Sequence, residues 1–189
     1  MKIGILLETN SSGGGAFTHS FNACLDLQRF KKKNDEIIVY THFKNSYDIL
    51  RKSKIPVKLF SHNLIDKILL KLSLIKFFRL LATILNINIS IEKLIIDNEF
   101  NFIFFPVLSN TVFCLKKIKF ISTLLDLEHF KHSKFPEITL KEFKYRENLY
   151  FYSLERSELI ITSYIKNFIN KKNINIAVAR AGNVIGGGD

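Results

Sequence analysis

The sequence predicts an α/β fold, in which a parallel sheet is covered by helices on both faces and three layers result. Short apolar runs typical of buried strands alternate along the chain with amphipathic segments typical of helices. This alternation is the pattern of parallel strands joined by crossover helices. Several apolar runs also end in polar or glycine-rich residues, as expected for loops at the carboxyl ends of strands. With 189 residues, the chain fits one ordinary domain or one half of a two-domain enzyme.

The first part of the chain predicts three strands separated by two helices. KIGILLE, starting at residue 2, is a short apolar run that leads into the glycine-rich NSSGGG. The next segment, 16–33, places Phe17, Phe21 and Cys24 at helical spacing and ends in lysines. EIIVYTH and PVKLF are the second and third strand candidates, and YDILRKSK between them suits a short helix.

The second part predicts a long helical segment and three further strands. Residues 64–97 are helical in pattern, and their longest stretch without charge, LLATILNINISI, is shorter than the ~20 residues of a membrane span. The basic residues of this segment either face anionic lipid or simply face water on a helix packed against the sheet. FNFIFFP, KFISTLLDL and ELIIT are strand candidates, and a helix is predicted over 140–157. The sheet should therefore hold about six parallel strands.

The composition and net charge of the chain indicate which kinds of protein and partner to expect. Hydrophobic residues make up 47% of the chain, which is enough for a sizeable core. The net charge of +11 comes from 28 Lys and Arg against 17 Asp and Glu. No nucleic-acid motif accompanies this charge. We therefore attribute the charge to the lysine-rich composition expected from an A/T-rich genome, together with some attraction to membrane surfaces, and expect no nucleic-acid partner.

The cysteines and the N-terminus indicate a reducing compartment. Cys24 and Cys114 lie far apart in apolar contexts, so the sequence predicts two buried free thiols and neither a disulfide framework nor a zinc site. The opening apolar run meets Glu8 after a few residues and is too short for a secretory signal. We expect a cytoplasmic protein, with peripheral contact on the inner face of the plasma membrane as an option.

A glycine-rich loop is the first candidate site. Gly13, Gly14 and Gly15 follow the first predicted strand and lead into a helix, where backbone N–H groups could face a phosphate. The loop is not the dinucleotide fingerprint, because Thr18 stands where the last glycine of GxGxxG would be. The alternative is a turn that serves chain geometry alone.

The segment TLLDLEHFKHSKFPEI is the most informative part of the chain. Asp126, Glu128, His129 and His132 gather after a predicted central strand, where polar residues favour a site. An isolated His–x–x–His could hold a metal, but no other ligands cluster with it. We instead predict His129 as a hydrogen-bonding or acid–base group, because imidazole titrates near neutrality.

Two further candidates follow. Arg146 and Glu147 lie on the predicted helix 140–157, and Ser163 ends the next strand. The pair is either a helix salt bridge or, for Arg146, an anion clamp that faces the cleft.

These motifs resemble those of a known enzyme family. GGGAFTHSFNACLDL, DLEHFKHSKFPE and KYRENLYFYSLERSELIITSYIKN occur in the order and at the spacing found in the N-terminal domains of GT-B-fold glycosyltransferases of the family-4 type. The resemblance covers roughly residues 2–170. It implies a Rossmann-like domain that forms the N-terminal, acceptor-side half of a GT-B fold.

The resemblance also implies an activity and its residues. The complete family transfers a sugar from a nucleotide-sugar to a hydroxyl acceptor, here a saccharide or lipid-linked acceptor of surface polysaccharide or lipopolysaccharide biosynthesis. The resemblance further implies that the glycine loop approaches the donor phosphates or the acceptor. Asp126 and His129 would be catalytic on the acceptor side, and Arg146 and Ser163 would bind substrate. No metal and no cofactor besides the nucleotide-sugar is expected.

Two departures from the family pattern matter. Leu125 stands where many relatives carry His or an aromatic residue before the Asp, so a catalytic role of that position is not supported. The relatives also bind the donor mainly through a second Rossmann-like domain with an acidic motif, for which this chain has no room. We therefore expect an inactive fragment.

The end of the chain resembles a different family. AVARAGNVIGGGD is similar to a segment of CDP-glucose 4,6-dehydratases. We expect an N-terminal domain over 1–172 and a fusion or truncation remnant over 173–189. Alternatively, INIAVARAG is simply the final strand of the N-terminal domain. The other functional alternatives are an NAD-dependent sugar-nucleotide dehydratase fragment and a non-catalytic module that binds membrane surfaces.

Overall fold

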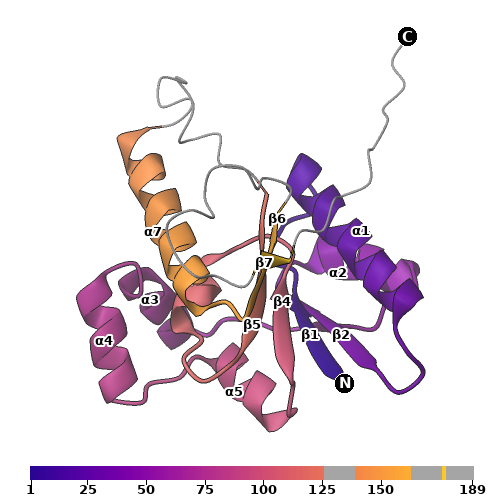
Figure 1. Ribbon diagram of the computed structural model, residues 1–189, viewed down its shortest axis with the longest axis horizontal. Coiled ribbons are helices and arrows are strands. Elements are labelled where there is room, and N and C mark those ends of the chain that lie inside the picture. Colours follow the sequence, from indigo (N-terminus) through magenta and orange to yellow (C-terminus); the bar gives the residue numbers. More distant parts are fainter. Residues whose placement is uncertain (126–138, 163–175, 178–189) are drawn as a thin grey trace.

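A seven-stranded parallel sheet forms the centre of the molecule (Figure 1). The computed structural model describes residues 1–125, 139–162 and 176–177. The strand order is β3-β2-β1-β4-β5-β6-β7, and every neighbouring pair is parallel. The strands are β1 (Lys2–Leu6), β2 (Glu36–Thr41), β3 (Val57–Leu59), β4 (Phe102–Phe105), β5 (Phe120–Leu124), β6 (Leu159–Thr162) and β7 (Ile176–Ala177).

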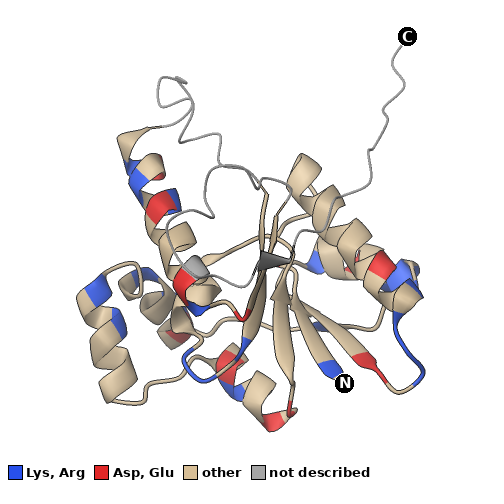
Figure 2. Cartoon of the chain, in the orientation of Figure 1, with Lys and Arg blue, Asp and Glu red and all other residues tan. Residues whose placement is uncertain are grey.

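Helices cover both faces of this sheet, which makes the predicted three-layer, Rossmann-like α/β fold. One face carries the first two helices, and the other carries the later helices (Figure 1). Most charged residues lie on helices and connections (Figure 2). The helices are α1 (Gly14–Phe30), α2 (Lys44–Lys52), α3 (Leu64–Leu72), α4 (Lys76–Ile84), α5 (Ser90–Asp97), the short 3-10 helix η1 (Asn110–Cys114) and α7 (Leu140–Arg156).

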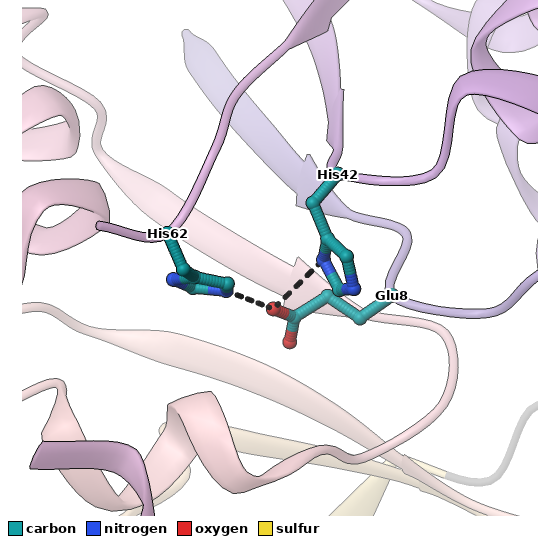
Figure 3. A group of neighbouring side chains, drawn as sticks. All are labelled: Glu8, His42 and His62. Carbon is teal, nitrogen blue, oxygen red and sulfur yellow. Dashed lines mark ion pairs between the residues drawn. The ribbon is translucent and has the colours of Figure 1, made fainter. Parts of the chain in front are cut away.

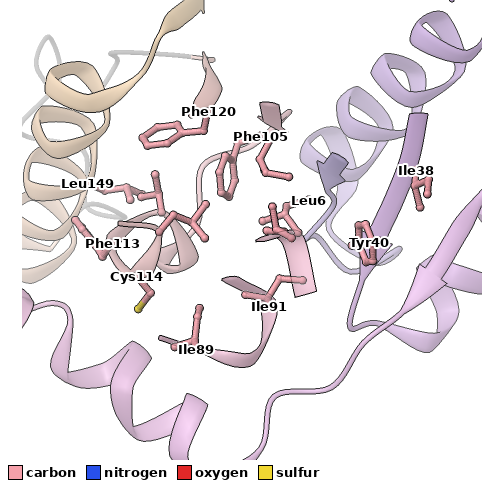
Figure 4. Close-up of a cluster of buried hydrophobic side chains, with 14 residues drawn as sticks. Leu6, Ile38, Tyr40, Ile89, Ile91, Phe105, Phe113, Cys114, Phe120 and Leu149 are labelled. Atoms are coloured by element: carbon pink, nitrogen blue, oxygen red, sulfur yellow. The ribbon is translucent and has the colours of Figure 1, made fainter. Parts of the chain in front are cut away.

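The central strands are buried on both faces because successive side chains point to opposite sides of a sheet. Ile5 and Leu7 pack toward α1 and α2, whereas Leu6 packs toward α5, η1 and α7 (Figure 4). The same alternation assigns Phe104 to the first core, and Ile103 and Phe105 to the second. This explains why the strands read as continuous apolar runs rather than as alternating patterns.

The long helical segment predicted over 64–97 is three helices, not one. Helix α3 starts with a capping box, in which Asn63 and Asp66 each accept a backbone N–H of the other. Asp66 also accepts the backbone N–H of Ser90 at 2.9 Å, which ties α3 to α5. Helix α4 ends before Asn86, which has a φ of 53°, a left-handed conformation that asparagine tolerates. Apolar periodicity does not reveal these breaks.

The sheet extends past the domain boundary that we expected at residue 172. Ile176 and Ala177 form β7, and Ile176 lies opposite Ile160 of β6. Our alternative interpretation, that INIAVARAG is the final strand of the N-terminal domain, allowed a strand at this position. None of the helices in the described parts of the chain combines the length and apolarity that a bilayer crossing requires.

Both cysteines are buried free thiols, as predicted. Burial raises the pKa of Cys24 to about 12 and that of Cys114 to about 11. Because the thiolate is the reactive form, we expect alkylation at pH 8 to be slower in the folded protein by roughly a hundredfold or more. Iodoacetamide labelling with and without denaturant, followed by mass spectrometry, measures this ratio. Equal labelling rates would contradict the burial of these thiols.

Candidate functional site

Three side chains from three successive strand ends converge at the carboxyl edge of the sheet (Figure 3). Glu8 follows β1, His42 follows β2 and His62 follows β3. Because the strands are parallel and adjacent, their carboxyl ends bring these residues to one edge. With Ser109 and Thr111, which follow β4, they form what we call the Glu8 cluster.

The Glu8 carboxylate lies at the centre of the cluster. Its Oε1 atom lies 3.8 Å from Nδ1 of His42 and 3.7 Å from Nε2 of His62. Thr111 donates its hydroxyl to Oε1 at 2.8 Å, and Ser109 donates its hydroxyl to Oε2. The Glu8 side chain is only 5% exposed, while His62 is 10% and His42 is 28% exposed. A nearly buried carboxylate is thus surrounded by polar groups from three other strand ends.

The cluster spans the topological switch point of the sheet. The chain builds outward from β1 through β2 to β3 and then returns to the other side of β1 with β4. In open α/β sheets, ligands bind in the crevice outside the strand ends at this point. Glu8 and Ser109 follow the two strands between which the order reverses, and their hydrogen bond bridges them.

The environment keeps Glu8 ionised and His42 neutral. Burial alone raises the pKa of Glu8, but His62, the hydroxyls of Ser109 and Thr111 and the charge of His42 together lower it below its ordinary value of 4.5. Burial lowers the pKa of His42 below 6.5, the negative charge of Glu8 partly opposes this shift, and His62 adds to it. The cluster therefore offers an ionised carboxylate and a neutral imidazole ring at neutral pH.

The depressed pKa of His42 has a measurable consequence. Protons favour the unfolded chain, so His42 costs stability as the pH falls below 6.5. We expect the ring signals of His42 to titrate below that value, and to titrate at a still lower pH in Glu8→Gln, because the neighbouring negative charge is gone. NMR titration of chelator-treated protein measures both. His19 serves as the control, since burial alone lowers its pKa, and an unshifted His42 in Glu8→Gln would contradict the coupling.

The glycine loop lies in the same connection as Glu8, between β1 and α1. Gly13 is the N-cap of α1, and a Cβ atom there would meet the backbone oxygen of Asn10 at 2.9 Å. Gly14 has a φ of +57°, which L side chains rarely adopt. A Cβ atom on Gly15 would meet nothing within 4 Å. Two of the three glycines are thus explained by backbone geometry, whereas Gly15 lies beside open space at the helix N-terminus.

The other predicted residues are distributed as follows. Arg146 lies on α7, and its Nε atom donates to Oε1 of Glu142 at 2.9 Å, one helical turn away. The pairing with Glu147 that we considered stays a prediction, and so does the role of Arg146 as an anion clamp. Asp126, His129 and Ser163 lie outside the described residues.

Sequence reasoning missed the Glu8 cluster. A signal was present, because Glu8, His42 and His62 each stand just after an apolar strand, as Asp126 does. We applied the strand-end argument to the segment with the densest polar residues and not to these single ones. What brings the single residues together is the pairing of β1 with β2 and of β2 with β3.

Fold and site define a Rossmann-like α/β protein with a polar cluster at its topological switch point. No protein-family model matches the sequence, and no curated protein is similar enough to count as a match.

Proposed function

We propose that this chain is the N-terminal, acceptor-side domain of a GT-B-fold, family-4-type glycosyltransferase. The complete enzyme would transfer a sugar from a nucleotide-sugar to a hydroxyl acceptor in surface polysaccharide biosynthesis, on the cytoplasmic side of the membrane. The observation that carries the proposal is that the glycine loop and a buried carboxylate share the β1–α1 connection at the switch point. The motif resemblance of residues 2–170 supports it independently.

The loop suits a phosphate-bearing ligand. The first turn of α1 contains no acidic residue and has no side-chain cap among the described residues, so its N–H groups and the helix dipole favour an anion. The Glu8 cluster, in the same connection, could accept hydrogen bonds from the hydroxyls of a sugar. A ligand with both a phosphate and hydroxyls, such as a nucleotide-sugar or a saccharide acceptor, would use both halves of the site.

Gly15→Ala tests whether the loop contacts this ligand. The added methyl group meets no atom within 4 Å, and alanine favours a helix, so stability should hold or rise by about 0.5–1 kcal/mol. The methyl group would nevertheless occupy the approach to the helix N-terminus. We expect the Kd for a bound nucleotide-sugar to rise about tenfold, measured by calorimetry with a panel of common nucleotide-sugars. Binding that Gly15→Ala leaves unchanged would assign the loop to chain geometry alone.

The activity itself is tested on the full-length product of the native locus, sequenced across codons 160–200. We expect hydrolysis of, or transfer from, at least one common nucleotide-sugar, and a product without either would overturn the proposal. Binding of NAD would instead favour the dehydratase alternative, although Thr18 breaks the fingerprint that such binding needs.

A second candidate function is binding to an anionic membrane surface through α3 and α4. No residue of α4 is buried, and Phe77, Leu80 and Ile84 are 65%, 60% and 70% exposed. Lys67 and Lys71 of α3 and Lys76 of α4 are exposed as well. Apolar side chains flanked by lysines match the boundary between acyl chains and anionic headgroups. This contact would place the enzyme near a lipid-linked acceptor.

Sedimentation with vesicles tests this candidate. We expect binding to vesicles of phosphatidylglycerol and phosphatidylcholine, and weaker binding in high salt, since salt screens the lysines. Phe77→Asp combined with Leu80→Asp should abolish it. Phe30→Asp is the matched control, because Phe30 is 74% exposed on α1, outside this region. Equal binding by both variants would exclude α3 and α4 as the membrane contact.

A further inference from the structure

The Glu8 cluster has the donor set of a metal centre. The nitrogen atoms of His42 and His62 and a carboxylate oxygen of Glu8 all lie within 4.8 Å of one another. Two ligands of one tetrahedral zinc ion, each about 2.0–2.1 Å from the metal, stand roughly 3.3 Å apart. The observed distances of 3.8 Å and 3.7 Å from Glu8 Oε1 to the two nitrogens exceed this by about half an ångström. The two nitrogen atoms lie within 4.8 Å of each other, so side-chain movements of no more than about 1.5 Å would bring all three atoms onto one ion.

The carboxylate is already held in place for such a role. Thr111 donates to Oε1 and Ser109 donates to Oε2, so both oxygens are oriented by hydroxyl groups. Hydrogen bonds to ligand side chains are characteristic of metal sites, where they fix ligand orientation and increase affinity. The hydroxyls come from the β4 end of the sheet, opposite the strands that carry the histidines. Residues on one side of the switch point therefore supply the imidazole ligands, and residues on the other side orient the carboxylate.

Both imidazole rings pack against aromatic neighbours, His42 on Phe43 and His62 on Phe60, but a nitrogen of each ring lacks a hydrogen-bond partner in the described part of the chain. Nδ1 of His42 is buried and has no hydrogen-bond partner within the described chain, although it faces Glu8. Its 3.8 Å separation from Oε1 is too long for a hydrogen bond. Nδ1 of His62 is also buried without such a partner. A buried polar atom without a partner is costly, and a metal ion would satisfy the nitrogen of His42.

We propose that Glu8, His42 and His62 bind a divalent transition-metal ion of the zinc class. Imidazole nitrogens select such ions over magnesium and calcium, which prefer oxygen ligands. Three protein ligands leave a further coordination position for water or a bound ligand, as in catalytic rather than structural zinc sites. An ion at the switch point could polarise a phosphate or hydroxyl oxygen of that ligand. This inference does not depend on the glycosyltransferase proposal.

The test uses tag-free protein of the full chain, stripped with a chelator. We expect Zn²⁺ to bind with a stoichiometry of about one and to raise Tm. Co²⁺ should give the visible absorption of a four- or five-coordinate site. His42→Ala, His62→Ala and Glu8→Gln should each lower the Zn²⁺ affinity at least about a hundredfold, since even the loss of a group that only hydrogen-bonds to a metal ligand costs about 10–100-fold. Ser109→Ala should cost about tenfold for the same reason.

The remaining histidines provide matched controls. His19→Ala removes a partly buried histidine of α1, and the double variant His129→Ala/His132→Ala removes the His–x–x–His pair. Both should keep wild-type affinity. Loss of binding in the double variant with retention in His42→Ala would overturn the proposal and move the metal to that pair.

Zinc X-ray absorption of the wild-type protein tests the site without any substitution. We expect a first shell of nitrogen and oxygen at about 2.0–2.1 Å and the outer-shell scattering of imidazole. A shell of water oxygens alone, a sulfur shell, or the lack of a stoichiometric complex would each overturn the proposal.

Discussion

Replacing Phe105 with alanine is expected to lower the free energy of unfolding by about 3–5 kcal/mol. Phe105 ends the central strand β4, is fully buried, and packs edge-to-face on Phe120 with ring centroids 5.8 Å apart. Truncation removes the transfer free energy of the ring and leaves a cavity between β4, β5 and the helices on that face. Since domains of this size are stable by only about 5–15 kcal/mol, the loss should be easily visible in urea unfolding followed by circular dichroism.

Phe30→Ala is the matched control for this substitution. Phe30 is 74% exposed at the end of α1, so the same change of residue type should alter stability by less than about 0.5 kcal/mol. Similar losses for both variants would show that burial does not decide the effect, and would contradict the core described above.

Replacing Arg156 with alanine should cost about 2–4 kcal/mol. Its guanidinium donates to the backbone oxygens of Leu115 and Lys116, the latter at 2.9 Å, and to the hydroxyl of Tyr152 at 2.7 Å. Its cation also lies over the ring of Tyr152, 5.3 Å from the centroid. The side chain therefore ties the end of α7 to the connection that precedes β5. Its removal leaves two carbonyl groups without these donors.

Arg156→Lys separates geometry from charge. Lysine keeps the positive charge but cannot donate in the planar fork that reaches both carbonyls and the hydroxyl, so we expect it to restore less than half of the lost stability. Arg51→Ala, at an exposed position near the end of α2, should change stability by no more than about 0.5 kcal/mol. Thermal unfolding of the three variants measures these differences, and full rescue by lysine would assign the effect to charge.

Most of the sheet could be predicted from the sequence because its strands are buried on both faces. A strand such as FIFF must be almost wholly apolar between two helical layers, and such short runs bounded by polar residues are easily read. The breaks within 64–97 could not be predicted in this way. They depend on the Asn63–Asp66 capping box and on the left-handed conformation of Asn86, which do not interrupt the apolar pattern.

The candidate site was predicted only in part. The glycine loop was found because three consecutive glycines after a strand are a local signal, and the structure explains Gly13 and Gly14 by a close contact and a positive φ. Glu8, His42 and His62 each give only a weak local signal, a single polar residue just after its strand. Their proximity depends on strand order and register, which join residues dozens of positions apart.

The sequence by itself determined the fold class, the approximate position of the strands and the burial of the thiols. All three follow from the periodicity and apolarity of short segments, which act over a few residues. Only the tertiary structure decided that Glu8 is buried, that Ser109 and Thr111 orient its carboxylate, and that His42 and His62 point at it. The physical reason is that these contacts form between the ends of parallel strands on both sides of the switch point, between groups that no local pattern connects.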